Sequence, residues 1–479
     1  MMTKHKEVDL TERPFLKKMI VYVIPLVFTG LLQCLYNAAD LVVVGSFKGP
    51  GALAAVGTTG ALTNLVLGLF MGLSVGAGVV VAQHIGALEY KKVERVVHSA
   101  ILLAAVLGVV VGVIGFIFSG TFLSWMDVKN SEEYKTLNHA TLYLRIIFCG
   151  VPASFIYNYC TSIVNATGET KKPLIILAIS GAVNVILNLI LVVGFDRGVD
   201  GVAIGTIASQ YLSAILILIY MMRVDNCIKF SFKKLCFDWG GVKKMLVIGI
   251  PSGIQGVLFS LSNVLIQSSV NSFGDPVMAG AAAAANLEGF CYVATNSVYR
   301  AALTFSGQNM GAKKYKNIKL IAIQAVLCST VIAIVCTGII MLFRDFFVGL
   351  YIADDTPKDV LKDTIEAAMT RIFCMFPLYF LLGIMEAMCG IIRGMGKSII
   401  TMIFSLTGAC FFRILWLQTA FKYINVLHSP AGIFISYPIS WFMVAALEVI
   451  YFIYLYRKLT RGSRVDSLIH KIKTHSYNK

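Results

Sequence analysis

Charged residues are scarce in this chain of 479 residues. Asp, Glu, Lys and Arg make up 14% of the sequence, hydrophobic residues make up 57%, and the mean hydropathy is +0.79. An ordinary soluble domain carries about 25% charged residues. The composition therefore excludes a typical water-soluble protein and indicates that most of the exterior faces a lipid bilayer.

The chain also has few histidines, and its cysteines show no spacing typical of a metal site or a disulfide framework. The seven His residues lie in tails, loops or predicted helix ends, and most of the eleven Cys residues lie inside apolar stretches. No zinc spacing, Ser-His arrangement or disulfide framework appears in the sequence. We expect no enzymatic activity, no cofactor and reduced, inert cysteines.

Long apolar runs are what the chain does have. A bilayer-spanning helix needs about 20 apolar residues, and twelve such runs occur in two sets of six. They predict an all-α integral membrane protein. The runs cover residues 19–44, 52–82, 96–118, 140–164, 174–194, 201–222, 245–270, 278–305, 320–343, 367–392, 399–421 and 431–456.

The net charge of +16 comes mainly from Lys and Arg in the short connectors between these runs. These residues do not form one continuous basic face, so we expect no nucleic-acid partner. Because positively charged loops stay in the cytoplasm, both termini are predicted to be cytoplasmic. The predicted regions are an N-terminal tail (1–18), a first half (19–222), a linker (223–244), a second half (245–456) and a C-terminal tail (457–479).

The two halves carry an internal repeat. A shift of 226 residues aligns Pro25 with Pro251, and a shift one residue shorter aligns Gln83 with Gln308. Six spans per half make both halves enter the membrane from the same side. Two such lobes around a central seam suit alternating access, so the pattern favours a transporter, although a scaffold or receptor shares it.

Four carboxylates lie within predicted spans, where each costs about 2.5 to 3.5 kcal/mol. Glu448 lies near Arg457 and either pairs with it or reaches the interface. Glu288 and Glu386 either neutralise a cationic substrate or pair with an arginine. The candidate partners are Arg300 and Arg413.

The fourth carboxylate, Asp40, is predicted to lie at the same depth in the membrane as three polar side chains. Asn184 and Asn188 are four residues apart on one face of the fifth span, and Thr206 begins the sixth. A carboxylate, two amides and a hydroxyl suit either a small hard cation such as Na⁺ or a protonated carboxyl. Pro25 breaks the hydrogen-bond ladder of the same first helix and is a candidate hinge, or a static kink.

From Lys17 to about Arg457, the chain resembles the multidrug and toxic compound extrusion (MATE) transporters. The segments that carry the resemblance are the first-helix stretch 25–45 with Tyr36-Asn37 and Asp40, the loops Gln83-His84-Ile85-Gly86-Ala87 and Gly307-Gln308-Asn309-Met310-Gly311-Ala312, the turn from Asn165-Ala166-Thr167-Gly168 to Pro173, and the helix entry 198–206.

The resemblance implies that Asp40, Asn184, Asn188 and Thr206 form the cation or proton site. Asn188 stands where the family often has Asp, which leaves one carboxylate and favours H⁺ over Na⁺ as the coupling ion. The seventh helix lacks a carboxylate where Gln255 and Asn263 lie, which favours the DinF-like branch.

What the resemblance further implies is export of amphipathic, often cationic compounds by antiport with H⁺ or Na⁺, by a monomer in a bacterial cell membrane. Substrate-cavity candidates, each of which is alternatively a packing residue or an ion-pair partner, are Tyr36, Asn37, Phe155, Tyr157, Asn263, Glu288, Tyr292, Tyr379, Glu386 and Arg413. The alternative is a flippase for a lipid-linked sugar or cell-wall precursor, because such flippases share the two-lobe fold. The four arginines within predicted spans keep that alternative open, because such flippases usually carry basic residues in the cleft.

Overall fold

The computed structural model describes residues 9–125, 136–349 and 358–476, and within these ranges it contains helices and no strand. Twelve of its helical segments are long and apolar enough to cross a membrane, as the sequence predicts. They are Phe15–Phe47, Gly68–Gly86, Tyr90–Trp125, Leu137–Ala166, Lys171–Gly194, Val199–Arg223, Trp239–Asn271, Asp275–Gly311, Tyr315–Leu342, Leu361–Gly394, Ser398–Tyr423 and Pro430–Arg461.

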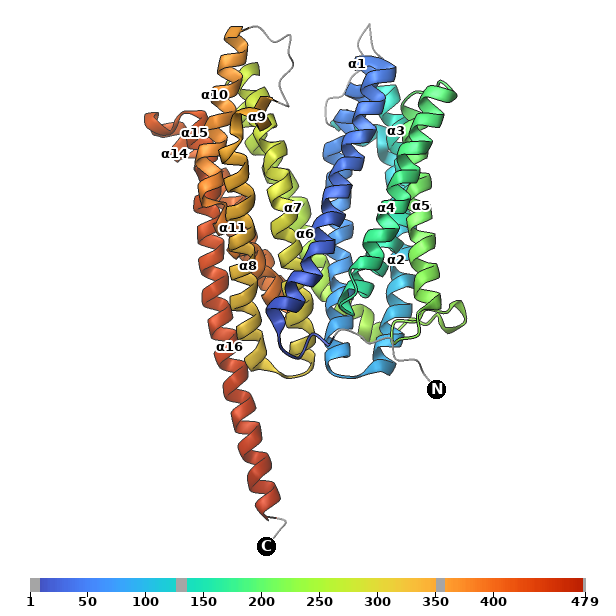
Figure 1. Cartoon of the computed structure of the whole chain (residues 1–479), viewed down its shortest axis with the longest axis vertical. Helices are drawn as coiled ribbons and strands as arrows, with labels where there is room; N and C mark the ends of the chain where they lie inside the picture. The colour runs from blue at the N-terminus through green and yellow to red at the C-terminus, as the bar shows by residue number, and fades with distance from the viewer. Residues whose placement is uncertain (1–8, 126–135, 350–357, 477–479) are drawn as a thin grey trace. The chain divides into compact units, whose positions relative to one another are not determined.

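Most of the helices that build these spans are labelled in Figure 1. In the first half they are α1 (Phe15–Gly86), α2 (Tyr90–Trp125), α3 (Thr136–Ala166), α4 (Lys171–Leu189), the π-helical turn η1 (Ile190–Gly194) and α5 (Val199–Arg223). The connector carries η2 (Phe232–Lys234). The helices that follow are α6 (Trp239–Asn271), α7 (Asp275–Gly311), α8 (Tyr315–Leu342), α9 (Arg344–Gly349), α10 (Lys358–Met375), η3 (Phe376–Leu378), α11 (Tyr379–Gly394), α12 (Ser398–Ser405), η4 (Leu406–Phe411), α13 (Phe412–Gln418), α14 (Ala420–Tyr423), η5 (Asn425–Leu427), α15 (Pro430–Phe434) and α16 (Ser436–Ser476).

Several spans are not single, separate α-helices. α1 contains both the first and the second span. Pro377 lies in the 3₁₀ turn η3, which separates α10 from α11 within the tenth span. Proline lacks the N–H that the α-helical ladder needs, so a break at this position is expected.

The structure bears out the internal repeat in the loops that follow the second and eighth spans. Leu88 and Lys313 occupy equivalent places and both have a positive φ, 58° and 54°. The preceding turns also match, because Ala87 N donates to Gln83 O and Ala312 N donates to Gln308 O. The same backbone conformation in both loops shows that the repeat is structural as well as sequential.

The chain divides into two compact units. The first is built mainly on Val21–Leu261 and the second on Leu10–Ile20 with Ser262–Lys479, so α1 and α6 contribute to both. In the first unit α3 packs against α2 and α5, and α5 also packs against α4. In the second unit α11 packs against α7, α8 and α16. The predicted boundaries at 19–222 and 245–456 stay predictions.

Glycine brings α1 and the first part of α6 backbone to backbone inside the first unit. A Cβ built at Gly72 would overlap the backbone of Gly253, and one built at Gly76 would overlap that of Met245. Spacing of small residues at four-residue intervals is the usual way that membrane helices approach closely. These glycines therefore dock the start of α6 onto the second span.

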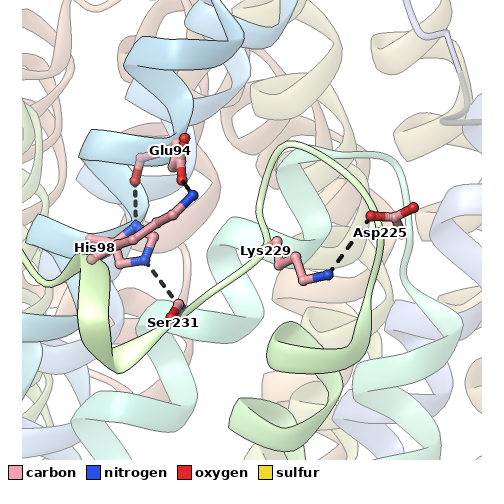
Figure 2. Close-up of polar contacts among 6 residues, drawn as sticks. Glu94, His98, Asp225, Lys229 and Ser231 are labelled. Carbon is pink, nitrogen blue, oxygen red and sulfur yellow. Dashed lines mark hydrogen bonds and ion pairs between the residues drawn. The ribbon is translucent and has the colours of Figure 1, made fainter. Parts of the chain in front are cut away.

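The connector after α5 is held against α2, as Figure 2 shows. His98 is fully buried; its Nδ1 contacts Glu94 O at 2.7 Å, and its Nε2 accepts from Ser231 N at 3.1 Å. Lys234 Nζ donates to Glu94 Oε1 at 2.6 Å. These bonds fix the connector to the first unit.

Candidate functional site

The structure brings the four predicted coupling residues together in the first unit. Asn188 Nδ2 donates to Asp40 Oδ1 at 2.5 Å, and Thr206 Oγ1 lies 3.2 Å from Asp40 Oδ2. Asn184 Nδ2 donates to Thr206 Oγ1 at 3.5 Å. The hydroxyl also lies 2.9 Å from Val202 O, one helical turn earlier. One carboxylate is thus held by two helices, α4 and α5, that pack on each other.

Two glycines make this arrangement possible. A Cβ at Gly205 on α5 would overlap Asn188 Oδ1, and a Cβ at Gly181 on α4 would overlap the ring of Tyr36. The Tyr36 hydroxyl donates to Ala178 O at 3.3 Å. Any larger residue at either glycine would push the amide or the first span away from its partner.

The site is polar but largely shielded. Asn184 and Asn188 are 4% and 1% exposed, and the carbonyl oxygen of each amide is buried without a hydrogen-bond donor. Tyr143 on α3, which sequence reasoning missed, is also buried and close enough to interact with Asp40 electrostatically. Directly after Asn188 and Leu189, α4 runs into the π-helical turn η1, a feature frequent at functional sites.

The other candidates of the first unit differ in burial and in the contacts that they make. Phe155 is fully buried, with its ring 4.2 Å from that of Phe70, and the Tyr157 hydroxyl donates to Pro173 O at 3.5 Å. Asn37 is exposed. Pro25 is buried in α1, and its carbonyl accepts from the Thr29 hydroxyl at 2.8 Å.

In the second unit Glu288 pairs with neither arginine considered from the sequence. Its Oε2 accepts from Arg371 Nη2 at 2.7 Å. Depth alone did not show which face of α10 meets α7, so this partner was missed. Tyr379 is fully buried, and its hydroxyl donates to the backbone carbonyl of Glu288 at 3.4 Å.

Glu386 and Glu448 lie near a different arginine, Arg393. Asn296 Nδ2 donates to Glu386 Oε2 at 3.5 Å, and Arg393 interacts electrostatically with both carboxyl groups. The side chain of Glu448 is fully buried, so the expectation that it reaches the interface is wrong. Within the described ranges, no ion pair joins Glu448 to Arg457. The position of Arg457 along the helix suggested a contact that the packing of α16 rules out.

The remaining candidates of the second unit differ in exposure. Asn263 and Tyr292 are exposed, the latter by 44%. Arg413 is buried, 7% exposed, and its Nε donates to Ser440 Oγ at 2.9 Å. Arg300 Nε donates to Asn296 Oδ1 at 3.4 Å.

Comparison with known proteins identifies the family. The model of the MatE family matches residues 25–190 and 251–416, two segments offset by the same 226 residues as the internal repeat. This chain belongs to the MatE family.

Curated relatives of this MatE protein match over almost the full length. The Probable multidrug resistance protein YoeA of Bacillus subtilis is 23% identical over 452 residues, 92% of this chain and 94% of the relative. The Multidrug export protein MepA of Staphylococcus aureus is 22% identical over 445 residues, 93% of this chain and 94% of the relative.

Solved structures show the same fold. An outward-facing multidrug resistance MATE family transporter of the MOP superfamily superposes with a TM-score of 0.87 at 19% identity, over 95% of this chain and 99% of that one. The MatE protein is therefore a multi-pass membrane protein of the MATE transporter fold, as the sequence predicts. The family to which it belongs consists of transporters, not enzymes.

Proposed function

We propose that this MatE protein exports amphipathic, often cationic organic compounds across the cell membrane by antiport with H⁺, with Na⁺ as the alternative coupling ion. The names of its relatives as multidrug resistance and multidrug export proteins support the export of drugs. We further propose that it acts as a monomer with both termini in the cytoplasm. The observation that carries the coupling proposal is the surroundings of Asp40.

Asp40 is a spanning-helix carboxylate whose hydrogen-bond partners are all neutral. Within the described part of the chain its side chain contacts two amides and a hydroxyl, and no Lys or Arg pairs with it. An ionised carboxylate at membrane depth is costly without a countercharge. An H⁺ or a small cation taken from solution supplies that countercharge and is free to leave again.

Thr206 suits both protonation states of Asp40. When Asp40 is ionised, the hydroxyl donates its single proton to the carboxylate. When Asp40 is protonated, the same hydroxyl donates to Val202 O, 2.9 Å away, and its oxygen accepts from the carboxyl. A proton therefore binds to Asp40 and leaves it without depriving the Thr206 hydroxyl of a hydrogen-bond acceptor.

Na⁺ is the alternative because the donor set also offers hard oxygen ligands. The unpartnered carbonyl oxygens of Asn184 and Asn188, together with Asp40 and Thr206, fit such an ion chemically. Only one of these four groups carries a charge, which is the reason for preferring H⁺. Substituting Asn188→Asp would add the second charge and should raise the dependence of transport on Na⁺.

The coupling step in this proposal is a bend of α1. Pro25 leaves one backbone carbonyl without its usual N–H donor, which makes the helix easiest to bend there. Neutralising Asp40 farther along the same helix changes its bonds to α4 and α5, which biases the bend. A charge moved inward across the membrane contributes about 2.3 kcal/mol per 100 mV, enough to drive uphill export.

The test is transport by purified protein in proteoliposomes with an imposed pH or Na⁺ gradient. Efflux of a cationic dye should follow the pH gradient in the wild type and be lost in Asp40→Asn. The matched control is Asp200→Asn, since Asp200 forms a surface ion pair with Arg197 at 3.0 Å and should leave transport unchanged. Equal gradient-driven efflux by wild type and Asp40→Asn would refute the coupling site. Translocation of a lipid-linked sugar in place of dye efflux would favour the flippase alternative.

A further inference from the structure

Arg413 is a buried cation that the proposed transport mechanism does not use. It lies on α13 with 7% of its surface exposed, and its guanidinium carbon is 4.1 Å from the ring centroid of Tyr437 on α16. Its Nε donates to Ser440 Oγ at 2.9 Å. No acceptor in the described ranges bonds to its two terminal amino groups. The two terminal amino groups of Arg413 therefore have N–H donors left to bind a ligand.

Arg371 shares the same aromatic surroundings. Its guanidinium carbon is 6.0 Å from the Tyr437 ring centroid and 5.4 Å from that of Phe434. Its Nη2 donates to Glu288 and its Nη1 lies 3.5 Å from Ala281 O, but its Nε is buried without an acceptor. Glu288 is thus already occupied by one arginine.

The charges of this cluster do not balance. Two guanidinium groups and one carboxylate leave one positive charge in excess, and an arginine does not lose its proton in proteins. The carboxylate that interacts most strongly with Arg413 is Glu288, which Arg371 already binds. The π face of Tyr437 offsets only part of a full charge at membrane depth.

We propose that Arg413, the ring of Tyr437 and the unpaired Nε–H of Arg371 form a binding site for an anionic group. This group is a carboxylate or phosphate carried on an apolar molecule. A guanidinium offers two parallel N–H donors that match either group. The inference rests on the proposed export function and extends its substrates to anionic and zwitterionic amphiphiles. The anionic group belongs either to a soluble compound or to a lipid headgroup, since both present the same chemistry.

The experiment measures binding of phenyl phosphate to the purified full-length protein by calorimetry. Arg413→Gln should weaken binding by about tenfold or more, because a charge-assisted bond is lost. Arg145→Gln is the matched control: Arg145 is an exposed arginine within a span, over the Phe116 ring at 5.8 Å. Binding of benzyltrimethylammonium, which has a ring but the opposite charge, should not be weakened by Arg413→Gln.

Folding is controlled with Arg413→Lys, which keeps the charge without the forked donors. It should retain part of the affinity, and phenyl phosphate should raise the melting temperature of the wild type and of Arg413→Lys more than that of Arg413→Gln. Asp40→Asn should bind phenyl phosphate like the wild type. Failure of the coupling site and failure of the anion site are thus distinguishable.

The source of the anion is resolved by a second arm in nanodiscs containing phosphatidylglycerol or only phosphatidylcholine. A melting temperature that rises with phosphatidylglycerol, and depends on Arg413, would identify a lipid headgroup as the occupant. Dependence on Arg413 for phenyl phosphate alone would identify a soluble anion. If neither probe binds in a way that depends on Arg413, the proposal is overturned.

Discussion

Asp40 in the first unit and Glu288 in the second are both carboxylates within spanning helices, yet they are neutralised in different ways. Asp40 is surrounded by amides and a hydroxyl, whereas Glu288 is paired with Arg371 at 2.7 Å. A fixed guanidinium cannot leave, but a proton or cation from solution can. The comparison indicates that Asp40 is suited to exchange its countercharge and that Glu288 is suited to hold its position.

The largest effect is expected from breaking the fixed pair. Arg371→Gln should lower the free energy of unfolding by about 3 to 5 kcal/mol, because Glu288 would be left as a buried charge without its partner. The double variant Arg371→Gln with Glu288→Gln should recover much of that loss. Denaturation of the purified single and double variants measures the coupling. Additive losses would show that the pair is not a unit.

The second prediction disturbs the geometry of Asp40 without touching its charge. Gly205→Ala would displace the Asn188 amide, and gradient-driven transport should fall by about three- to tenfold, which is typical of a modest coupling energy. Gly194→Ala is the control, because nothing lies within 4 Å of a Cβ built there. Equal transport by the two variants would show that the Asn188 contact is not needed.

The third prediction contrasts the two carboxylates by the same chemical change. Asp40→Asn should change the free energy of unfolding by less than about 1 kcal/mol, because an amide still accepts from its neutral neighbours. Glu288→Gln should cost several times more, since it leaves Arg371 uncompensated. Thermal unfolding of both variants provides the measurement. A larger loss in Asp40→Asn would reverse the comparison.

The smallest effect is expected at a surface carboxylate outside the spans. Hydrogen bonds from Lys92 and then His84 hold the pKa of Glu89 below its usual value. A lowered folded-state pKa stabilises the protein above the unfolded-state pKa, and this contribution disappears as the pH falls through the folded-state value. Melting temperatures of wild type and Glu89→Gln should therefore differ slightly at neutral pH and converge in acid.

Much of the first unit's site was predictable from the sequence. Asn184 and Asn188 share a helix face because they are four residues apart, and span direction places Thr206 at the depth of Asp40. Span lengths likewise predicted the twelve helices, and the shift of 225 residues that aligns Gln83 with Gln308 predicted matching loops, which the structure shows at Leu88 and Lys313. These features depend on spacing along the chain, which a sequence displays directly.

The second unit was less predictable because its charges depend on which helix faces meet. Depth does not distinguish Arg371 from Arg413 as the partner of Glu288. Spacing along the twelfth span placed Glu448 near Arg457, although the side chain of Glu448 is fully buried. The glycines that make room for Asn188 and Tyr36 are equally invisible in the sequence, since their role depends on interhelical distances of a few ångström.

The exchangeable charge of Asp40 is tested most directly by infrared difference spectroscopy during acidification of the purified protein. The wild type and the double variant Glu288→Gln with Arg371→Gln should both show a band of a newly protonated carboxyl that is missing in Asp40→Asn. Identical spectra from wild type and Asp40→Asn would contradict the account, because they would show that Asp40 does not take up a proton.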